Sequence, residues 1–514
     1  MVMSLIFLIG CSNGETSSPL DTDKTVEKEW GSELNIAIDT QPTTLDQHMT
    51  TATIVSDIGR HIYEQLVALN SAYQVVPMLA ESIDEREDGK LFTFHLRKGV
   101  MFHNGKEMKA EDVIASLEKW QATSSRAQAL IPDMKLTELD EYTVEMSIGK
   151  AVYGILTLFA DVGQSAIIMP KEIAEAAGPT GATVYVGTGP FKFEEWKQDQ
   201  YIHITKYDDY SAVDLATDGL AGKKEALVDD IYFHIITDSS TRLAGLVTGQ
   251  YDLAMAVPYD NYDMVNNDPN LETAIDLAGP VGLVLNKKEG IFSDNKMRQA
   301  INTALDTENI MMAAFPDEKF YRLDHGYMMV EQEEWYNEAG KDRYNINNPE
   351  KAKQLFEEAG YNGEEIKMIT TKDYEYMYNS AVVIQEQLKA IGVNVKLDVT
   401  DWATILDLRT KPSEYDGFVT QFPKVMTPQQ ILHLGSEWPG WTNDQEISDL
   451  IQEINAAGSA EEAKAIFSKL QDRMYDYLTI VKFGDMYDFF GHSAKMDGLT
   501  LQDGMILWNT TIEK

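Results

Sequence analysis

The stretch that decides the fold runs from Asp88 to Trp120 and reads DGKLFTFHLRKGVMFHNGKEMKAEDVIASLEKW. Its first part alternates apolar and polar residues, which is typical of a strand with one buried face. The alternating apolar positions are Phe92, Phe94 and Leu96. Its second part begins with two acids, Glu111 and Asp112, which stabilise the positive end of a helix. The apolar residues that follow fall on one helical face and are Val113, Leu117 and Trp120. A strand followed by an amphipathic helix is therefore predicted.

The same two patterns recur on both sides of this stretch. Residues 34–38 and 142–148 alternate like strands, and residues 382–391 carry a helical apolar stripe. Gly392 ends that stripe and residues 393–399 alternate again, so a helix runs directly into a strand. Helices and strands are mixed along the chain, which predicts an α/β fold. A chain of 514 residues is too long for one hydrophobic core, so several lobes are expected.

Two further helices are predicted from their first residues. Asp294 precedes an apolar stripe that begins at Met297, and it is a favourable N-cap residue. Asn348-Pro349 combines an N-cap with a proline in the first helical turn, and Gly360 marks the end of that helix.

Charge is the unusual part of the composition. The chain contains 43 basic and 83 acidic residues, which gives a formal net charge of −40. A field of this sign repels phosphate groups, so we expect no nucleic-acid partner. Two interpretations of the charge stay open: it keeps the protein soluble in a salty or extracellular medium, or it steers a cationic solute.

The single cysteine ends the sequence Leu8-Ile9-Gly10-Cys11, behind a short apolar run. This pattern is typical of a bacterial lipoprotein signal, so we predict a signal over residues 1–11 and lipid attachment at Cys11. The alternative is an inert free thiol. The run is short and no Lys or Arg precedes it, which indicates a translation start a few codons upstream. Residues 12–33 are polar without apolar periodicity, and we expect them to form a disordered tether.

Motifs of common catalytic sites are missing from the sequence, which contains no GxSxG, HExxH, CxxC or GxGxxG. The loop from Gly99 to Lys106 resembles a phosphate-binding loop only superficially. It has five residues between its glycines, and Glu107 stands where a magnesium-binding Ser or Thr is needed. We therefore expect no enzymatic activity, no cofactor and no metal site.

Aromatic residues are concentrated late in the chain, at Trp402, Phe422, Trp438, Trp441 and Tyr487. Aromatic side chains line solute-binding clefts because they offer large contact areas at a low entropy cost. They are also ordinary components of a hydrophobic core, and the sequence leaves both interpretations open.

Six segments, in order along the chain, closely resemble family 5 of the ABC-transporter solute-binding proteins, which are dipeptide, oligopeptide and nickel binders. One segment is the stretch from Asp88 to Trp120. The other five are PTTLD at 42–46, GTGPFKFEEW at 187–196, MRQAINTALDTENI at 297–310, NPEKAKQLFEEAGY at 348–361 and QLKAIGVNVKLDVTDW at 387–402. The resemblance extends from Leu34 to about Phe490.

The resemblance implies a periplasmic-binding-protein-like α/β fold (type II, cluster C), with two main lobes and an extra insertion domain. Domain I is expected over residues 34–66, 184–279 and 486–514. Domain II is expected over residues 67–183, and domain III over residues 280–485. Two crossovers, near Gly279-Pro280 and near Asp485 to Tyr487, are expected to form the hinge about which the lobes close.

The resemblance also implies where the ligand binds. Peptide binders of the family often carry an acid after a strand of domain III, and this acid pairs with the α-ammonium group of the peptide. In residues 420–426 the only ionisable side chain is Lys424. We therefore expect Lys424 to favour a carboxylate, phosphate or neutral oxygen of the solute. The alternative is that Lys424 faces solvent and that one of the many acids elsewhere in the chain anchors the ligand. The predicted ligand contacts are Trp402, Thr420, Gln421, Phe422, Lys424, Trp441 and Tyr487.

The implied function is capture of a peptide or peptide-like small solute for an ABC importer, with delivery to its membrane permease. Alternatives within the same fold are a nickel chelate, an opine or an oligosaccharide as the ligand. A secreted hydrolase is the alternative from another class. We expect a monomer that works outside the cytoplasm, either anchored by lipid to the outer face of the cell membrane or in the periplasm.

Overall fold

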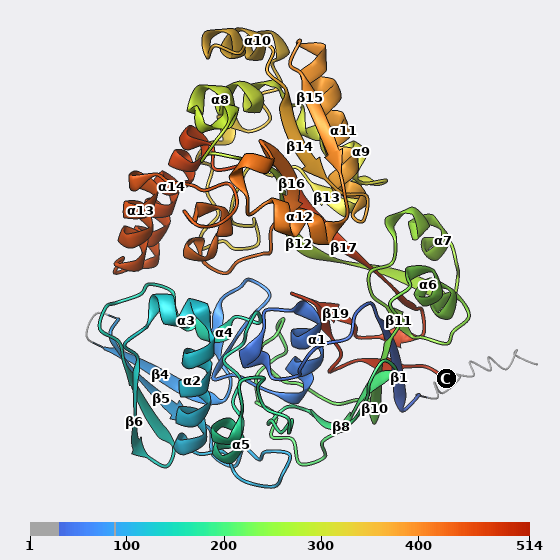
Figure 1. Ribbon diagram of the computed structural model, residues 1–514. Helices are drawn as coiled ribbons and strands as arrows, with labels where there is room; N and C mark the ends of the chain where they lie inside the picture. Colours follow the sequence, from blue (N-terminus) through green and yellow to red (C-terminus); the bar gives the residue numbers. More distant parts are fainter. Residues whose placement is uncertain (1–29, 87–88) are drawn as a thin grey trace, which may run out of the picture.

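The computed structural model describes residues 30–86 and 89–514, which fold into two lobes (Figure 1). The lobes lie one above the other and are joined at one side, where β12 (Leu271–Leu285) and β17 (Val481–Ser493) run between them. The predicted signal, the lipid-attachment residue Cys11 and all but the last few residues of the predicted tether lie outside the described residues. No helix within residues 30–86 and 89–514 combines the length and apolar character needed to cross a bilayer.

One mixed sheet of eleven strands passes through both lobes. Its part in the upper lobe contains, in order, β15 (Val395–Val399), β14 (Ile366–Thr370), β16 (Gly417–Gln421), β12 and β17, with β13 (Tyr321–Arg322) paired to β17. Its part in the lower lobe contains β11 (Leu253–Ala254), β1 (Glu33–Ile38), β10 (Asp230–Ile235), β9 (Tyr201–Lys206) and β8 (Phe191–Lys197). The pair β12–β17 is therefore the part of the sheet shared by the two lobes.

The helices of the upper lobe flank its part of the sheet. They are α8 (Asn295–Ala304), α9 (Thr307–Ala314), α10 (Pro349–Glu358), α11 (Glu375–Ala390), α12 (Trp402–Leu408), α13 (Gln445–Asn455) and α14 (Ala460–Tyr477). Two of the predicted N-caps are confirmed. The Asp294 carboxylate accepts a hydrogen bond from the Lys296 amide (2.8 Å), and the Asn348 side chain accepts one from the Lys351 amide (3.0 Å).

The lower lobe carries a second sheet, of four strands, covered by helices. The strands are β4 (Ala80–Arg86), β5 (Leu91–Leu96), β7 (Thr143–Ser147) and β6 (Lys135–Asp140), in that order. The helices nearby are α2 (Ala110–Thr123), α3 (Ser125–Leu130), α4 (Ile155–Ala160) and α5 (Lys171–Ala176).

The remaining α-helices and strands are α1 (Thr53–Ile62), α6 (Ser239–Val247), α7 (Tyr262–Asn266), β2 (Val67–Leu69), β3 (Val75–Pro77), β18 (Met496–Asp497), β19 (Thr500–Leu501), β20 (Met505–Ile506) and β21 (Thr511–Ile512).

The predicted strand and helix of the deciding stretch are confirmed as β5 and α2. Phe92 and Phe94 of β5 and Trp120 of α2 are fully buried in one apolar cluster, where the Trp120 ring lies 5.1 Å from that of Phe159. The loop between β5 and α2 contacts the GTGP segment, because the His103 amide donates to the Gly187 carbonyl oxygen (3.0 Å). A Cβ at Gly187 would overlap the carbonyl of Ile62, so this segment can pack against α1 only as glycine. The stretch therefore builds the core of the lower lobe.

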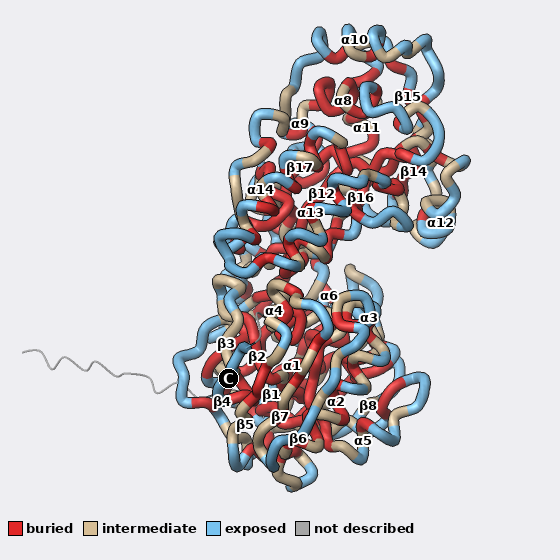
Figure 2. Tube along the Cα trace, turned by 90° about the vertical axis from the view of Figure 1, so that its left-hand side faces the viewer, coloured by how far each residue is buried: buried red, intermediate tan, exposed pale blue. Residues whose placement is uncertain are grey.

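Buried residues gather inside each lobe, and exposed residues cover the outer surfaces (Figure 2). Among the described residues, the largest apolar cluster packs α8, α9 and α11 against β12, β16 and β17. A second cluster packs α1 against β1, β8, β9 and β10. Each lobe thus has its own core, and the hinge strands contribute to both.

Gly279 is a constrained position in the β12–β17 ribbon. The pairing of β12 with β17 shifts register between Leu277 and Gly279, and Gly279 has φ +132°. A Cβ there would overlap the carbonyl oxygen of Phe422 and crowd the Lys424 amide. The crossover predicted at Gly279-Pro280 lies in β12 at this irregularity, and the one predicted near Asp485 to Tyr487 lies in β17. The predicted domain boundaries themselves stay predictions.

We expect Gly279→Ala to destabilise the protein by about 1–3 kcal/mol more than Gly249→Ala, because the new methyl group must displace backbone atoms. Gly249 is the matched control, since its φ is also positive (+72°) but an added Cβ would contact nothing within 4 Å. Urea denaturation followed by circular dichroism measures the difference. Equal destabilisation by the two substitutions would show that the space beside Phe422 imposes no constraint.

Candidate functional site

A buried ion pair connects the two lobes beside the hinge ribbon. The Lys424 ammonium, in the loop that follows β16, lies 2.9 Å from a carboxylate oxygen of Asp503, at the turn between β19 and β20. The two side chains are only 4% and 8% exposed. The same ammonium lies 5.1 Å from the ring centre of Tyr73, in the turn between β2 and β3. Lys424 therefore binds groups of the lower lobe although it belongs to an upper-lobe loop.

The acids around Lys424 keep it charged. Burial alone would lower the pKa of Lys424, but the nearby Asp503, Tyr73 and Asp276 together raise it above its usual value. Asp276 belongs to β12 and is fixed in place, since one of its oxygens accepts a hydrogen bond from the Gly504 amide (2.8 Å). The positive charge of Lys424 is thus shared among acids of the protein itself.

A second group of acids lies on the hinge ribbon and beside it. Asp276 of β12 and Asp488 of β17 are direct partners in the antiparallel register, so both side chains leave the ribbon on the same face. Desolvation by the surrounding protein, followed by the charges of Asp276 and Asp39, raises the pKa of Asp488 to about 6 against the opposing effect of Lys424, although the residue itself is exposed. Asp39 follows β1 in the lower lobe. We call Asp39, Asp276 and Asp488 the ribbon acids.

Two tyrosines, Tyr259 and Tyr376, lie near Asp488. The Tyr259 hydroxyl donates to the carbonyl oxygen of Tyr487 (2.8 Å), one residue before Asp488. Burial, then the charge of Asp488, raises the pKa of Tyr259. Tyr376 of α11 is stacked on Phe315, with ring centres 6.0 Å apart, and the charge of Asp488 also acts on it. Acids and aromatic rings from both lobes therefore meet at the ribbon.

The lobes also touch on the side of α4. The Tyr153 amide donates to the Asn455 carbonyl oxygen (2.9 Å), and the Gln430 side-chain amide donates to the Asp161 carboxylate (3.1 Å). Arg126 holds the same carboxylate at 2.6 Å. These polar contacts join the lobes away from the continuous strands, in addition to the Lys424–Asp503 pair beside the ribbon.

The predicted ligand contacts fall into two groups. Gln421, Lys424 and Tyr487 lie at or next to the ribbon, and Gln421 donates to the Ala278 carbonyl oxygen of β12 (3.0 Å). Thr420, the neighbour of Gln421, is buried in β16. The other three lie within the upper lobe. The ring centre of Phe422 lies 5.0 Å from that of His433. The Trp441 ring stacks on that of Tyr415, with ring centres 6.0 Å apart. Trp402 is half-buried, and its ring centre lies 5.2 Å from that of Tyr374.

Sequence reasoning missed the ribbon acids and the tyrosines beside them. In a chain with 83 acidic residues, no single aspartate stands out by type or spacing. The available signal is that Asp276 and Asp488 each lie within three residues of a predicted crossover. Their direct pairing depends on strand register, which the sequence pattern does not specify.

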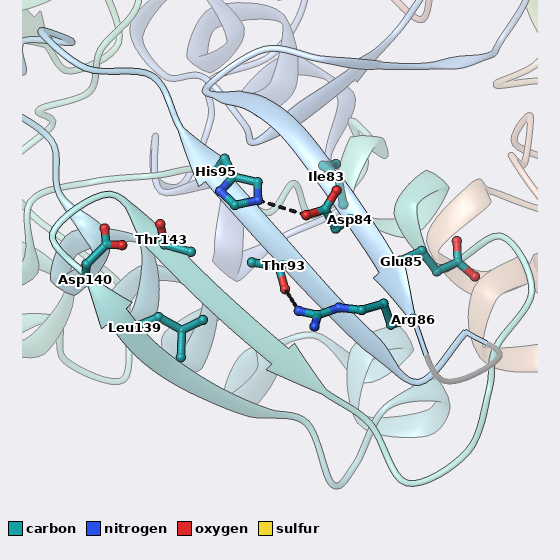
Figure 3. Close-up of a pocket in the computed structure, with 9 residues that line it drawn as sticks. All are labelled: Ile83, Asp84, Glu85, Arg86, Thr93, His95, Leu139, Asp140 and Thr143. Carbon is teal, nitrogen blue, oxygen red and sulfur yellow. Dashed lines mark hydrogen bonds and ion pairs between the residues drawn. The ribbon is translucent and has the colours of Figure 1, made fainter.

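An open depression of about 630 Å³ lies elsewhere, on the β4–β5–β7–β6 sheet (Figure 3). His95 lies 3.0 Å from Asp84 in it, and Arg86 donates to Thr93 (2.8 Å). The side chains of Asp84, Arg86 and His95 are 41–64% exposed, so water competes for each of them. In the part of the chain that the structure describes, no group of three or more His, Cys, Asp or Glu side chains is arranged to hold a metal ion.

Residues 74–434 match the family model of the bacterial extracellular solute-binding proteins, family 5 (middle region). The chain belongs to this family. The predicted family and fold class are thereby confirmed, and so is the broader function of extracellular solute binding.

Curated relatives of this family-5 protein are similar over nearly their whole length. A probable peptide ABC transporter periplasmic-binding protein of Sinorhizobium fredii is 28% identical, over 90% of this chain and 90% of its own. The oligopeptide-binding protein AppA of Bacillus subtilis is 26% identical, over 93% of this chain and 91% of its own.

Solved structures are similar as well. The binding protein AgaA of A. tumefaciens R10, in complex with agropinic acid, is 27% identical with a TM-score of 0.74, over 94% of this chain and 99% of AgaA. The structure of B. subtilis AppA with a nonapeptide has a TM-score of 0.74 at 22% identity, over 95% of this chain and 100% of AppA. This second likeness supports the fold.

We expect Lys424→Met to destabilise the family-5 protein by about 3 kcal/mol, because it leaves the buried carboxylate of Asp503 without its cation. The double variant Lys424→Met/Asp503→Asn should recover most of the loss, since neither charge remains. Lys341→Met is the control for an exposed pair, because Lys341 and Glu338 are more than 60% exposed, and its effect should stay below about 1 kcal/mol. Urea denaturation measures all three. A double variant no more stable than Lys424→Met would contradict this role of the pair.

Proposed function

We propose that this chain is the solute-binding subunit of an ABC importer, and that it captures a peptide or peptide-like solute between its lobes and delivers it to the membrane permease. The observation that carries the proposal is similarity, over at least 90% of both chains, to two binding proteins whose names specify peptide transport and oligopeptide binding. The two-stranded hinge supports it, because a ribbon shared by two separately packed lobes allows them to close on a solute.

The interlobe residues support a polar, peptide-like solute. Backbone amides of a peptide need hydrogen-bond acceptors when they leave water, and the carboxylates of the ribbon acids are acceptors at this place. The seven predicted contacts remain proposals. Gln421 and Tyr487 lie at the ribbon and are only partly buried, so they are the two whose positions best allow contact with a solute; the side chain of Lys424 is buried and paired with Asp503.

An opine is the second candidate for the solute. The observation that favours it is the 27% identity, over 94% of this chain, to AgaA in complex with agropinic acid. None of the relatives and structures named above is described as binding a nickel chelate or an oligosaccharide. We propose that the protein releases its solute unaltered rather than hydrolysing it, because the family to which it belongs is one of solute-binding proteins.

Native mass spectrometry of the purified protein tests the proposal. We expect a solute in the mass range of a short peptide or an opine to remain bound through purification and to be released unaltered by denaturation. Recovery of a cleaved product after incubation with the same solute would instead support the hydrolase. A protein that retains nothing and binds neither peptides nor opines in calorimetry would contradict the proposal.

Closure of the lobes is expected on binding. Small-angle X-ray scattering with saturating solute should give a smaller radius of gyration than without it. At a hundredfold excess over the dissociation constant, the solute should stabilise the protein by about 2.7 kcal/mol if it binds only the folded, closed state. An unchanged radius at saturation would show that this chain binds without closing.

We also propose that the chain is attached to the membrane through lipid at Cys11, outside the cytoplasm, and that it acts as a monomer. The Leu8 to Cys11 pattern supports the lipid, since two or more acyl chains anchor a protein stably. Cells expressing the gene from its native upstream start should retain the wild type in the membrane fraction and lose Cys11→Ala from it. Equal release of both forms would exclude the anchor.

A further inference from the structure

We propose that a small, mostly enclosed cavity inside the lower lobe binds an inorganic anion of about the size of chloride. The cavity has a volume of about 30 Å³, and its lining includes Gln47, Tyr63, Glu64, Lys224 and Trp508. A water molecule needs roughly 10–15 Å³ of such space, so one small ion fits. The site belongs to the lower lobe alone, and it is independent of the solute proposed to bind between the lobes.

Three of the lining side chains carry buried hydrogen-bond donors without a partner. They are the side-chain amide nitrogen of Gln47, the hydroxyl of Tyr63 and the indole nitrogen of Trp508, none of which is paired with a described residue. The three residues are between 1% and 3% exposed, so bulk water does not pair with these groups. The amide and indole nitrogens can only donate. Unpaired buried donors cost stability, and they indicate a guest that accepts hydrogen bonds.

The carboxylate in the cavity wall is already engaged by its own neighbours. Glu64 accepts hydrogen bonds from the hydroxyls of Thr188 (3.1 Å) and Tyr210 (2.9 Å). The Lys224 ammonium also lies 3.5 Å from this carboxylate. The unpartnered donors of the cavity therefore remain available to a guest.

Positive charge exceeds negative charge in the cavity wall, although the whole chain carries −40. Arg60 and Lys224 both line the cavity, and Glu64 is the one acid among the described residues that line it. Arg60 lies 3.5 Å from Asp57, outside the lining. Burial raises the pKa of Asp57 to about 7, so this carboxyl is only partly ionised near neutral pH and balances Arg60 incompletely. The local charge favours an anion.

Lys224 is the cation that carries the site. Its side chain is 7% exposed, and its ammonium lies 4.6 Å from the ring centre of Trp508. Burial lowers the pKa of Lys224, and the charge of Glu64 offsets this effect only in part. A second negative charge beside the ammonium would compensate for the remaining cost of burying it.

An anion in this cavity would also act on the connection between the lobes. The Arg60 guanidinium donates to the carbonyl oxygens of Gln502 (3.0 Å) and Asp503. These residues form the turn that presents the Asp503 carboxylate to Lys424 of the upper lobe. A guest that fixes Arg60 therefore stabilises the lower-lobe half of the interlobe ion pair.

Thermal unfolding in sodium chloride and in sodium gluconate at matched ionic strength tests the site, because gluconate is too large for the cavity. We expect the unfolding temperature to be about 2 °C higher in chloride, since an ion that binds only the folded state stabilises it. Crystals soaked in sodium bromide should show an anomalous peak in the cavity, within hydrogen-bond distance of Gln47 or Trp508.

Three variants assign the effect to the cavity. Gln47→Leu removes a donor without changing charge and should lower the chloride-dependent shift. Lys224→Met/Glu64→Gln removes the buried ion pair as a unit, so neither charge is left unpaired, and it should abolish both the shift and the bromide peak. Lys223→Met/Glu225→Gln is the matched control. It removes the neighbouring pair (2.8 Å), whose side chains are each 49% exposed, and it should keep the full shift.

Each other outcome counts against the site. A bromide peak in the cavity without a chloride-dependent shift in solution would mean an adventitious ion only and would overturn the proposal. Water in the cavity without anomalous signal would overturn it as well, and so would an equal shift in the wild type and in Lys224→Met/Glu64→Gln. If that double variant does not fold, Gln47→Leu decides: a reduced shift supports the site, and an undiminished shift overturns it.

Discussion

The antiparallel pairing of β12 with β17 is the interaction on which the rest of the structure depends. These strands belong to the cores of both lobes, so the two lobes share one continuous set of backbone hydrogen bonds. A ribbon of two strands resists separation of the lobes but bends more easily than a wide sheet, which suits a hinge. The register shift at Gly279, where a side chain would strike Phe422, locates an irregularity in the ribbon next to Lys424.

Electrostatics gives the hinge a second role. The Lys424–Asp503 pair is buried and internally balanced, so it stabilises a particular arrangement of the lobes. Asp276 and Asp488 face each other on the ribbon, and the nearby Lys424 opposes the repulsion between them, so the ion pair and the ribbon acids form one connected group of charges. The overall charge of −40 acts at longer range, since it attracts cations toward the molecule.

The most recognisable stretch of the sequence, from Asp88 to Trp120, serves the fold rather than the site. Its strand and helix fill the core of the lower lobe, and its loop packs against the GTGP segment beside α1. The residues at the ribbon have ordinary sequence surroundings by comparison. Function in this fold therefore varies through a few side chains on a shared scaffold, which is why two structurally similar proteins can bind a nonapeptide and agropinic acid.

Much of the architecture was determined by the sequence alone. Alternating residues specified β5 and β15, the caps Asp294 and Asn348 specified the starts of α8 and α10, and six ordered motifs specified the family. These signals are local, so periodicity and capping chemistry suffice to identify them. Only the tertiary structure decided that Lys424 pairs with Asp503, and that Asp276 faces Asp488 with Asp39 nearby. Those contacts join residues up to several hundred positions apart, and they depend on strand register and chain crossing, which no local pattern records.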